Sequence, residues 1–145
     1  MAKERFSPIP RLNRPRGGNL RLLLDTHIFI WWDRQLRRVP AEVRAAIEDG
    51  ANDIFISSAT VWEIAVKRAT GKLAFAASIV ETVERAGFEL LPITGAHAEH
   101  AVGLPRHHND PFDRMLVAQA MLEGVVLGTQ DPLMRPYAVP ALGLR

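Results

Sequence analysis

The sequence predicts an α/β fold with a mainly parallel sheet. Short apolar runs of the kind that form buried strands, such as Leu20–Leu24 and Ile54–Ile56, alternate with longer segments that carry apolar residues at helical spacing. Glycine, proline and serine stand where many of these segments meet. Strands that alternate with helices in this way indicate βαβ units, and therefore a parallel sheet.

The first half of the domain is expected to hold two strands and three helices. Proline suits the start of a helix because the N–H that it lacks would have no partner there. Ser57 and Ser58 are each able to cap the helix that follows them. The elements are, in order, a strand at Leu20–Leu24, a helix over 28–36, a helix from Pro40 to about Gly50, a strand at Ile54–Ile56 and a helix over 59–70, in which Ala59, Trp62 and Val66 stand at helical spacing.

The second half is expected to add two strands, several helices and an edge strand. Gly87 and Gly124 follow two of the helices, at a position that favours glycine. The elements are a helix over 76–86, a strand at Phe88–Ile93, a short helix over 95–103, a helix over 111–123, a strand at Val125–Leu127, a short helix from Asp131-Pro132 and an edge strand at Val139–Leu142.

The composition fits one globular domain. The 145 residues are 48% hydrophobic and 23% charged, and a domain of this length buries roughly 70% of the surface that its unfolded chain exposes. The absence of cysteine excludes disulfides and thiolate metal sites. No apolar run is long enough to cross a membrane, and no secretory signal follows the N-terminus. We therefore expect a cytoplasmic protein with no membrane association.

Basic residues are concentrated at the N-terminus. Residues 1–21 contain six basic residues and one acidic residue, whereas residues 22–145 contain 12 basic and 15 acidic residues, for a net charge of +2. Residues 1–19 are rich in proline, glycine and charge, which predicts a flexible basic extension before a domain at 20–145. The extension is a disordered tail, an arm that contacts nucleic acid or a partner, or the result of a translation start placed too far upstream.

Acidic residues collect where the predicted strands end. Asp25 ends the first strand, Glu63 lies in the helix after the second strand, and Asp131 follows the fourth strand. Asp113 lies in the first turn of the helix before the fourth strand. Ligands of open α/β sheets bind beyond the carboxyl ends of the strands. We therefore expect these side chains to gather at one edge of the sheet, Asp113 only if its helix starts there.

Most of these acids also have a purely structural explanation. Asp110 and Asp131 each precede a proline, as a helix N-cap often does. Asp113 in a first turn suits the helix dipole, and Glu63 is able to form a capping box or to pair with a lysine four residues on. Asp25 has the weakest structural explanation, because it ends an apolar strand at a crowded edge.

Taken together, the acids indicate a cation site. Several carboxylates in one cleft repel one another, and a bound cation relieves that repulsion. Oxygen ligands without cysteine favour Mg²⁺ or Mn²⁺ over zinc. Such an ion activates water and neutralises charge on a phosphodiester. The candidate catalytic and metal-binding residues are therefore Asp25, Glu63, Asp113 and Asp131.

The aromatic residues near these acids have less specific roles. His107 and His108 lie in the loop beside Asp110, where hydrogen bonding within the loop is the favoured explanation and substrate contact the alternative. Trp31 and Trp32 follow the first strand. Packing in the core or at a partner interface is favoured for these tryptophans over base stacking. The sequence contains no glycine-rich phosphate loop.

Four motifs stand in order along residues 20–142. They are Leu22-Leu23-Leu24-Asp25-Thr26-His27, then Ile56-Ser57-Ser58 through Trp62-Glu63-Ile64, then Asp110-Pro111-Phe112-Asp113-Arg114 followed by Leu116-Val117-Ala118-Gln119-Ala120, and finally Gly128-Thr129-Gln130-Asp131. Each motif is weak alone. Together they resemble the PIN domain, and in detail the VapC-type toxins of bacterial toxin–antitoxin pairs.

The resemblance implies a three-layer α/β/α sandwich and a Mg²⁺- or Mn²⁺-dependent endoribonuclease. It also implies a homodimer that is silenced by a cognate VapB-type antitoxin. The family's principal metal ligands, direct or through water, correspond to Asp25, Glu63 and Asp113, and Asp131 completes the cluster. The supporting residues that it implies are Thr129, Thr26 and Asp110.

Two other functions stay open at this point. A haloacid-dehalogenase-like phosphatase also begins with a strand that ends in aspartate, but it requires a second aspartate two positions later, where this chain has His27. A non-catalytic interaction module would use the acids only as helix caps. Metal-dependent cleavage of RNA distinguishes the ribonuclease from both.

Overall fold

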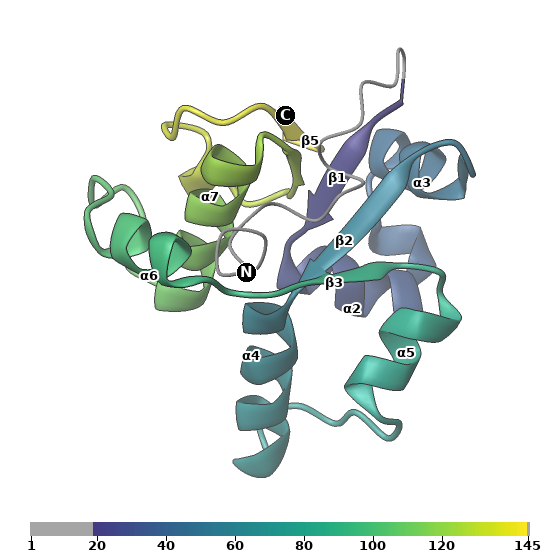
Figure 1. Cartoon of the computed structure of the whole chain (residues 1–145). Helices are drawn as coiled ribbons and strands as arrows, with labels where there is room; N and C mark the ends of the chain where they lie inside the picture. The colour runs from purple at the N-terminus through teal and green to yellow at the C-terminus, as the bar shows by residue number, and fades with distance from the viewer. Residues whose placement is uncertain (1–18, 145) are drawn as a thin grey trace, which may run out of the picture.

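One sheet of five parallel strands forms the centre of the protein (Figure 1). The computed structural model describes residues 19–144, so the expected extension at 1–19 lies, apart from its last residue, outside the described residues. The strands stand in the order β3-β2-β1-β4-β5. Their bounds are β1 (Arg21–Leu24), β2 (Asp53–Ser57), β3 (Glu89–Leu91), β4 (Val126–Gly128) and β5 (Ala141–Leu142). The predicted parallel sheet is confirmed, including its short edge strand.

Helices cover both faces of the sheet, which makes the three-layer α/β/α sandwich that the resemblance implies (Figure 1). None of the helices within residues 19–144 is long and apolar enough to cross a bilayer. The helices are α2 (Thr26–Arg34), α3 (Ala41–Glu48), α4 (Ser58–Ala69), α5 (Ile79–Arg85), α6 (Gly95–Val102) and α7 (Pro111–Glu123), with 3-10 turns η2 (Leu36–Arg38) and η3 (Pro132–Met134).

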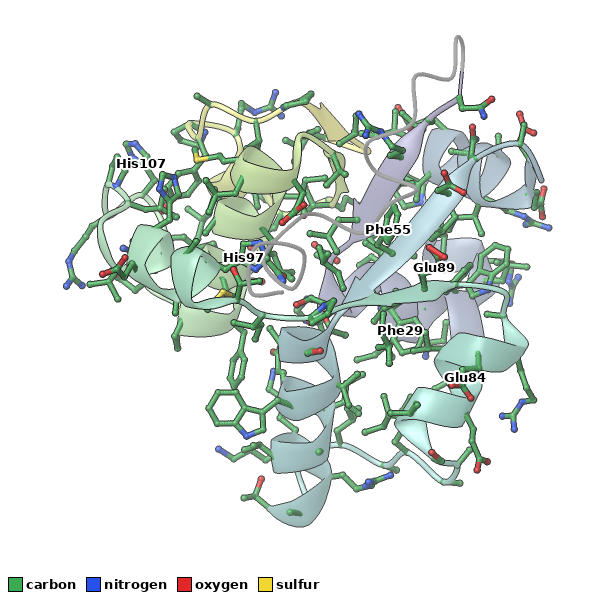
Figure 2. All side chains as sticks on the ribbon, viewed as in Figure 1. Phe29, Phe55, Glu84, Glu89, His97 and His107 are labelled. Carbon is green, nitrogen blue, oxygen red and sulfur yellow. The ribbon has the colours of Figure 1, made fainter. Side chains whose placement is uncertain are left out.

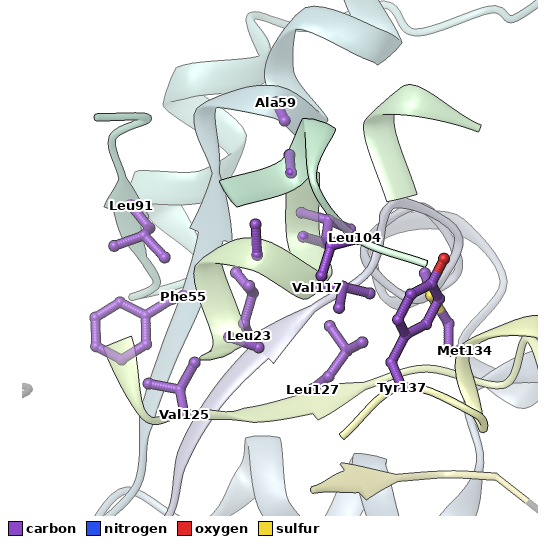
Figure 3. Packing of buried hydrophobic residues seen from close by; sticks show 14 residues of the cluster. Leu23, Phe55, Ala59, Leu91, Leu104, Val117, Val125, Leu127, Met134 and Tyr137 are labelled. Atoms are coloured by element: carbon purple, nitrogen blue, oxygen red, sulfur yellow. The ribbon is translucent and has the colours of Figure 1, made fainter. Parts of the chain in front are cut away.

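Alternation along β1 divides the core into two parts. Leu23 belongs to a cluster with α6 and α7 on one face of the sheet (Figure 3). Leu22 and Leu24 belong to a second cluster, with α2, α3 and α5 on the other face. All three leucines are fully buried. A strand that is buried on both faces has a continuous run of apolar residues in its sequence, which is typical of strands in parallel sheets.

The register of the sheet places the carboxyl ends of three strands, β1, β2 and β4, beside one another. Leu24 at the end of β1 pairs with Ile56 of β2 on one side and with Gly128 of β4 on the other. The backbone N–H of Asp25 continues the ladder with a hydrogen bond to the Gly128 carbonyl, 2.8 Å. The residues that follow these strands therefore start from one edge of the sheet, where parallel α/β folds place their ligands.

Candidate metal and catalytic site

Asp25 is the first residue beyond β1 and caps helix α2. Its Oδ1 accepts a hydrogen bond from the Ile28 N–H at 2.9 Å, and the Thr129 hydroxyl donates to its Oδ2. The residue is only 3% exposed. Burial raises the pKa of the Asp25 carboxyl, although both hydrogen bonds act in the opposite direction. Asp25 is therefore a buried carboxyl group held in one orientation.

Glu63 lies one turn into α4 and is also 3% exposed. Its Oε2 accepts a hydrogen bond from Lys67 Nζ at 2.7 Å, which is the i,i+4 pair that the sequence allowed. This hydrogen bond raises the pKa of Lys67. The other oxygen, Oε1, is buried and has no hydrogen-bond partner within the described part of the chain. A buried carboxylate oxygen without a partner is costly in an apolar interior, and this one belongs to a residue whose charge acts on Asp113, so it is able to serve as a cation ligand together with the neighbouring acids.

Asp113 joins the site because α7 starts at this edge of the sheet. Asp110 caps the helix, and its Oδ1 accepts from the backbone N–H groups of Phe112 at 2.8 Å and Asp113 at 3.2 Å. Burial and the charge of Asp110 raise the pKa of Asp113 to about 7, and Asp25 and Glu63 act in the same direction. The condition that the sequence set for Asp113 is therefore met.

His108 connects the last two acids. Its Nε2 donates to Asp131 Oδ2 at 2.9 Å and lies 3.1 Å from Asp113 Oδ2. Its Nδ1 accepts from the Asp110 N–H at 3.1 Å, which places a ring proton on Nε2. Ligand atoms of His108, Asp113 and Asp131 all lie within 4.8 Å of one another. Because Nε2 is occupied by a proton in this arrangement, His108 orients the carboxylates rather than ligating with them.

The three supporting residues also lie at this edge. Thr129 Oγ1 donates to Asp25 and accepts from the Asp131 N–H at 3.1 Å, so one hydroxyl connects the ends of β1 and β4. Thr26 Oγ1 lies 3.0 Å from Thr60 Oγ1, which ties the first turn of α2 to that of α4. Asp110 and Asp131 serve as the N-caps that the sequence predicted.

The loop that carries His108 is held by two side chains from other segments. The Tyr137 hydroxyl donates to the Pro105 carbonyl at 2.8 Å and accepts from the His108 N–H at 2.9 Å. His107 points to the outer side of the loop, where its ring packs on Tyr137 (Figure 2). The buried Arg114 guanidinium donates to the carbonyl oxygens of Ala101, Val102, Leu104, Pro105 and His108. Apart from its place near the Asp-Pro pair, nothing in the sequence pattern indicated this role of His108.

These residues fit a hard divalent cation. Carboxylates from four different segments meet, and burial with mutual repulsion raises the pKa values of Asp25 and Asp113. The unpartnered Oε1 of Glu63 adds an oxygen ligand. Oxygen ligands of this kind suit Mg²⁺ or Mn²⁺. The acid cluster predicted from the sequence is thus brought together, and His108 is added to it.

A family model of the PIN domain matches residues 22–139, and the chain belongs to this family. A ribonuclease of Mycobacterium tuberculosis, VapC22, is 29% identical over 127 residues, which cover 82% of this chain and 93% of the relative.

Solved structures show the same fold. VapBC from Salmonella typhimurium, bound to DNA, has a TM-score of 0.58 at 18% identity, covering 85% of this chain and 97% of that one. VapBC-5 from Mycobacterium tuberculosis, a member of the VapBC toxin–antitoxin systems, has a TM-score of 0.56 at 21% identity, covering 86% and 98%.

Proposed function

We propose that this chain is a metal-dependent endoribonuclease, with Mg²⁺ or Mn²⁺ as its cofactor. The observation that carries the proposal is the gathering of Asp25, Glu63, Asp113 and Asp131 at the carboxyl edge of the sheet, with one buried oxygen of Glu63 left unpartnered. The ribonuclease VapC22 supplies the reaction class, since it covers nearly the same length of chain.

In this proposal Asp25, Glu63 and Asp113 hold the metal, directly or through water, and Asp131 completes the cluster. When bound, the ion activates water and neutralises charge on the scissile phosphodiester. Thr129 fixes the orientation of Asp25 through the hydroxyl hydrogen bond to Oδ2. Rigid donors around carboxylates of this kind keep a site in its working geometry without rearrangement during the reaction.

We further propose that the enzyme is the toxin of a toxin–antitoxin pair. It would act in the cytoplasm as a homodimer and be silenced by a VapB-type antitoxin. Solved proteins of the same fold, including VapBC-5, are described as members of such systems. Co-expression with the product of an adjacent short open reading frame tests this: the partner should restore growth and co-purify with this chain.

Replacement of the Asp25 carboxylate tests the catalytic proposal. Asp25→Asn should lower metal-dependent cleavage of total cellular RNA by more than about 100-fold, since even groups that only support metal ligands contribute 10–100-fold. Asparagine is a good N-cap, so the variant should fold. Cleavage is followed by mapping of RNA ends, with EDTA to stop the reaction and Mg²⁺ or Mn²⁺ to restore it.

The exposed Asp49, which follows α3 and lies outside the acid cluster, gives a matched control. Asp49→Asn should cleave like the wild type. Full activity of Asp25→Asn, in a preparation shown to be free of other nucleases, would contradict the proposal. Phosphatase activity on small phosphomonoesters without RNA cleavage would favour the haloacid-dehalogenase-like alternative, and neither cleavage nor metal-dependent stabilisation would favour an interaction module.

A further inference from the structure

A hollow opens directly beside two of the site acids. Its volume is about 330 Å³, which is at the lower end of the ~300–1,000 Å³ of typical small-ligand pockets. Two acids, Asp25 and Asp131, are part of its lining. The rest of its lining is polar or aromatic and comes from His27, Trp31, Arg38 and Gln130.

The hollow continues into a strip of arginines over η2 and α3. A second hollow of about 490 Å³ shares Arg38 and Gln130 with the first and adds Arg37 and Arg44. A third hollow of about 550 Å³ lies over residues 34–38. Arg38 lines all three. We call this surface the arginine groove and define it by His27, Trp31, Arg37, Arg38, Arg44 and Gln130.

Arg38 is held in place as a flat cationic surface. Its guanidinium lies over the Trp31 ring, 4.4 Å from the ring centroid, and one of its nitrogens, Nη1, donates to Gln35 Oε1 at 3.1 Å. The side chain stays exposed. A guanidinium stacked on an aromatic ring keeps N–H groups at its edge that are able to donate to phosphate oxygens.

The neighbouring arginines, Arg37 and Arg44, add positive charge to the groove. Neither of them is paired with a buried acidic residue in the described part of the chain. Arg37 is exposed and forms no hydrogen bond or ion pair within residues 19–144. Arg44 has a surface ion pair with Glu48 at 3.1 Å, a type of pair that contributes little energy and exchanges readily. Positive charge therefore runs away from the acids along one path.

We propose that the arginine groove binds the single-stranded RNA segment next to the scissile phosphate; this inference rests on the proposed ribonuclease function. Arg38 and Arg37 contact successive backbone phosphates, while His27 and Gln130 face the nucleotide nearest to Asp25 and Asp131. Trp31 is a positioning residue that keeps the Arg38 guanidinium flat.

Within residues 19–144, the other side of the site has no comparable strip of arginines. There the exposed Trp62 packs edge-on against Phe112, with ring centroids 5.4 Å apart. The nearby Lys67 is already bound to Glu63. Binding of RNA depends largely on contacts between cationic side chains and phosphates, so the charge distribution favours the arginine groove for the strand.

Binding is measured in a protein that cannot cleave the probe. The Asp113→Asn variant serves as the background, because Asp113 does not line the arginine groove. The probe is a fluorescein-labelled single-stranded RNA of mixed sequence, about 12 nucleotides long, followed by fluorescence anisotropy with Mg²⁺ present. Adding Arg37→Ala and Arg38→Ala together should weaken binding roughly tenfold or more. It should also reduce the salt dependence of log K by about 0.7 for each phosphate that the protein no longer neutralises.

Two further variants sharpen the result. Arg85→Ala removes the same charge from an exposed position on α5 that lines none of the hollows, and it should bind like the background protein. Arg38→Lys keeps the charge but loses the flat stacked surface, so it should bind with intermediate affinity. In a protein with all the site acids intact, Arg37→Ala together with Arg38→Ala should raise the KM for RNA cleavage and leave kcat nearly unchanged.

The outcomes separate the inference from the proposed function. If the wild type cleaves RNA while the double variant binds the probe as tightly as the background, the arginine groove is not the substrate path and only this inference is overturned. Unchanged RNA binding with loss of antitoxin binding would assign the groove to a protein partner and overturn it equally. A wild type that neither binds nor cleaves RNA would overturn both.

Discussion

Two buried charged groups on neighbouring helices, Arg114 of α7 and Glu63 of α4, have opposite surroundings. The Arg114 guanidinium donates five hydrogen bonds to backbone carbonyls at 2.8–3.2 Å. Glu63 has one oxygen bound to Lys67 and a second, buried oxygen with no partner in the described chain. Both side chains belong to the motifs that identified the family, so sequence pattern alone does not distinguish them.

The difference separates a buried charge that has several hydrogen-bond partners from one that is only partly satisfied. A buried polar group with several hydrogen bonds stabilises one conformation, whereas a buried polar atom without a partner costs stability. Arg114 therefore holds the loop that presents His108 to the acids. Under the proposed function, a bound cation would give the second Glu63 oxygen its missing partner. Substitutions that affect Arg114 and substitutions that affect the acid cluster should therefore differ in their effects on stability and on RNA cleavage.

The largest expected effect is on stability. Arg114→Met should fold less stably by about 3–5 kcal/mol, because an apolar side chain of similar length leaves five carbonyl oxygens without their donor. Urea denaturation followed by circular dichroism measures the change. Arg106→Met, at an exposed position of the same loop, is the control and should stay within about 0.5 kcal/mol of the wild type. Equal stability of the two variants would show that the carbonyl network contributes nothing.

Gly143 lies against the backbone of Thr129, whose hydroxyl donates a hydrogen bond to Asp25 in the acid cluster. Its φ of +104° suits glycine, and a Cβ placed there would lie 2.6 Å from the Thr129 carbonyl oxygen. Gly143→Ala should therefore cost about 2–3 kcal/mol in the free energy of unfolding. RNA cleavage should fall as well, because the shifted Thr129 loses its hydrogen bond to Asp25.

The control for this prediction is Gly50→Ala, where nothing lies within 4 Å of the new Cβ. Both variants are compared by thermal unfolding and by cleavage rate per folded molecule. A Gly143→Ala protein that is destabilised but cleaves at the wild-type rate would show that the site tolerates displacement of Thr129.

Elements that depend on local signals were predicted well from the sequence. The helix at Pro111–Glu123 has the predicted bounds, because Asp110 caps it, proline occupies its first position, and Gly124 ends it in the left-handed conformation. Asp25 was expected at the sheet edge because it directly follows an apolar strand. Its cap on α2 starts that helix at Thr26, two residues before the predicted position.

Features that depend on distant partners were not predictable in this way. His108 meets Asp131, which lies 23 residues away, only after α7 and β4 have packed together. Trp62 stands at helical spacing with buried residues, yet it is 62% exposed, and its ring meets Phe112 of α7 edge-on. Helical periodicity shows which residues share a face, but it does not show whether another element covers that face.

The smallest expected effect concerns the repulsion within the acid cluster. In protein freed of divalent metal, Asp113→Asn should be more stable than the wild type by about 1–2 kcal/mol above pH 7, because it removes a charge that burial and neighbouring acids disfavour. The pKa of Asp113 is raised from 3.8 to about 7. Between these values the folded state binds the proton more tightly than the unfolded state, so the wild type loses stability as pH rises from about 4 to 7.

Paired unfolding curves with EDTA between pH 4 and 8 measure this difference. The advantage of Asp113→Asn should be near zero at pH 4, grow through the interval and level off above pH 7. Asp25, whose pKa is also raised, adds the same sign of pH dependence to both proteins. Its charge raises the pKa of Asp113, so the difference between the two proteins includes this interaction. Mg²⁺ should then stabilise the wild type more than the variant, because a ligand that binds only the folded state shifts the unfolding equilibrium. A variant less stable than the wild type at pH 8 without metal would contradict the claim that Asp113, like Glu63, is retained at a cost to folding.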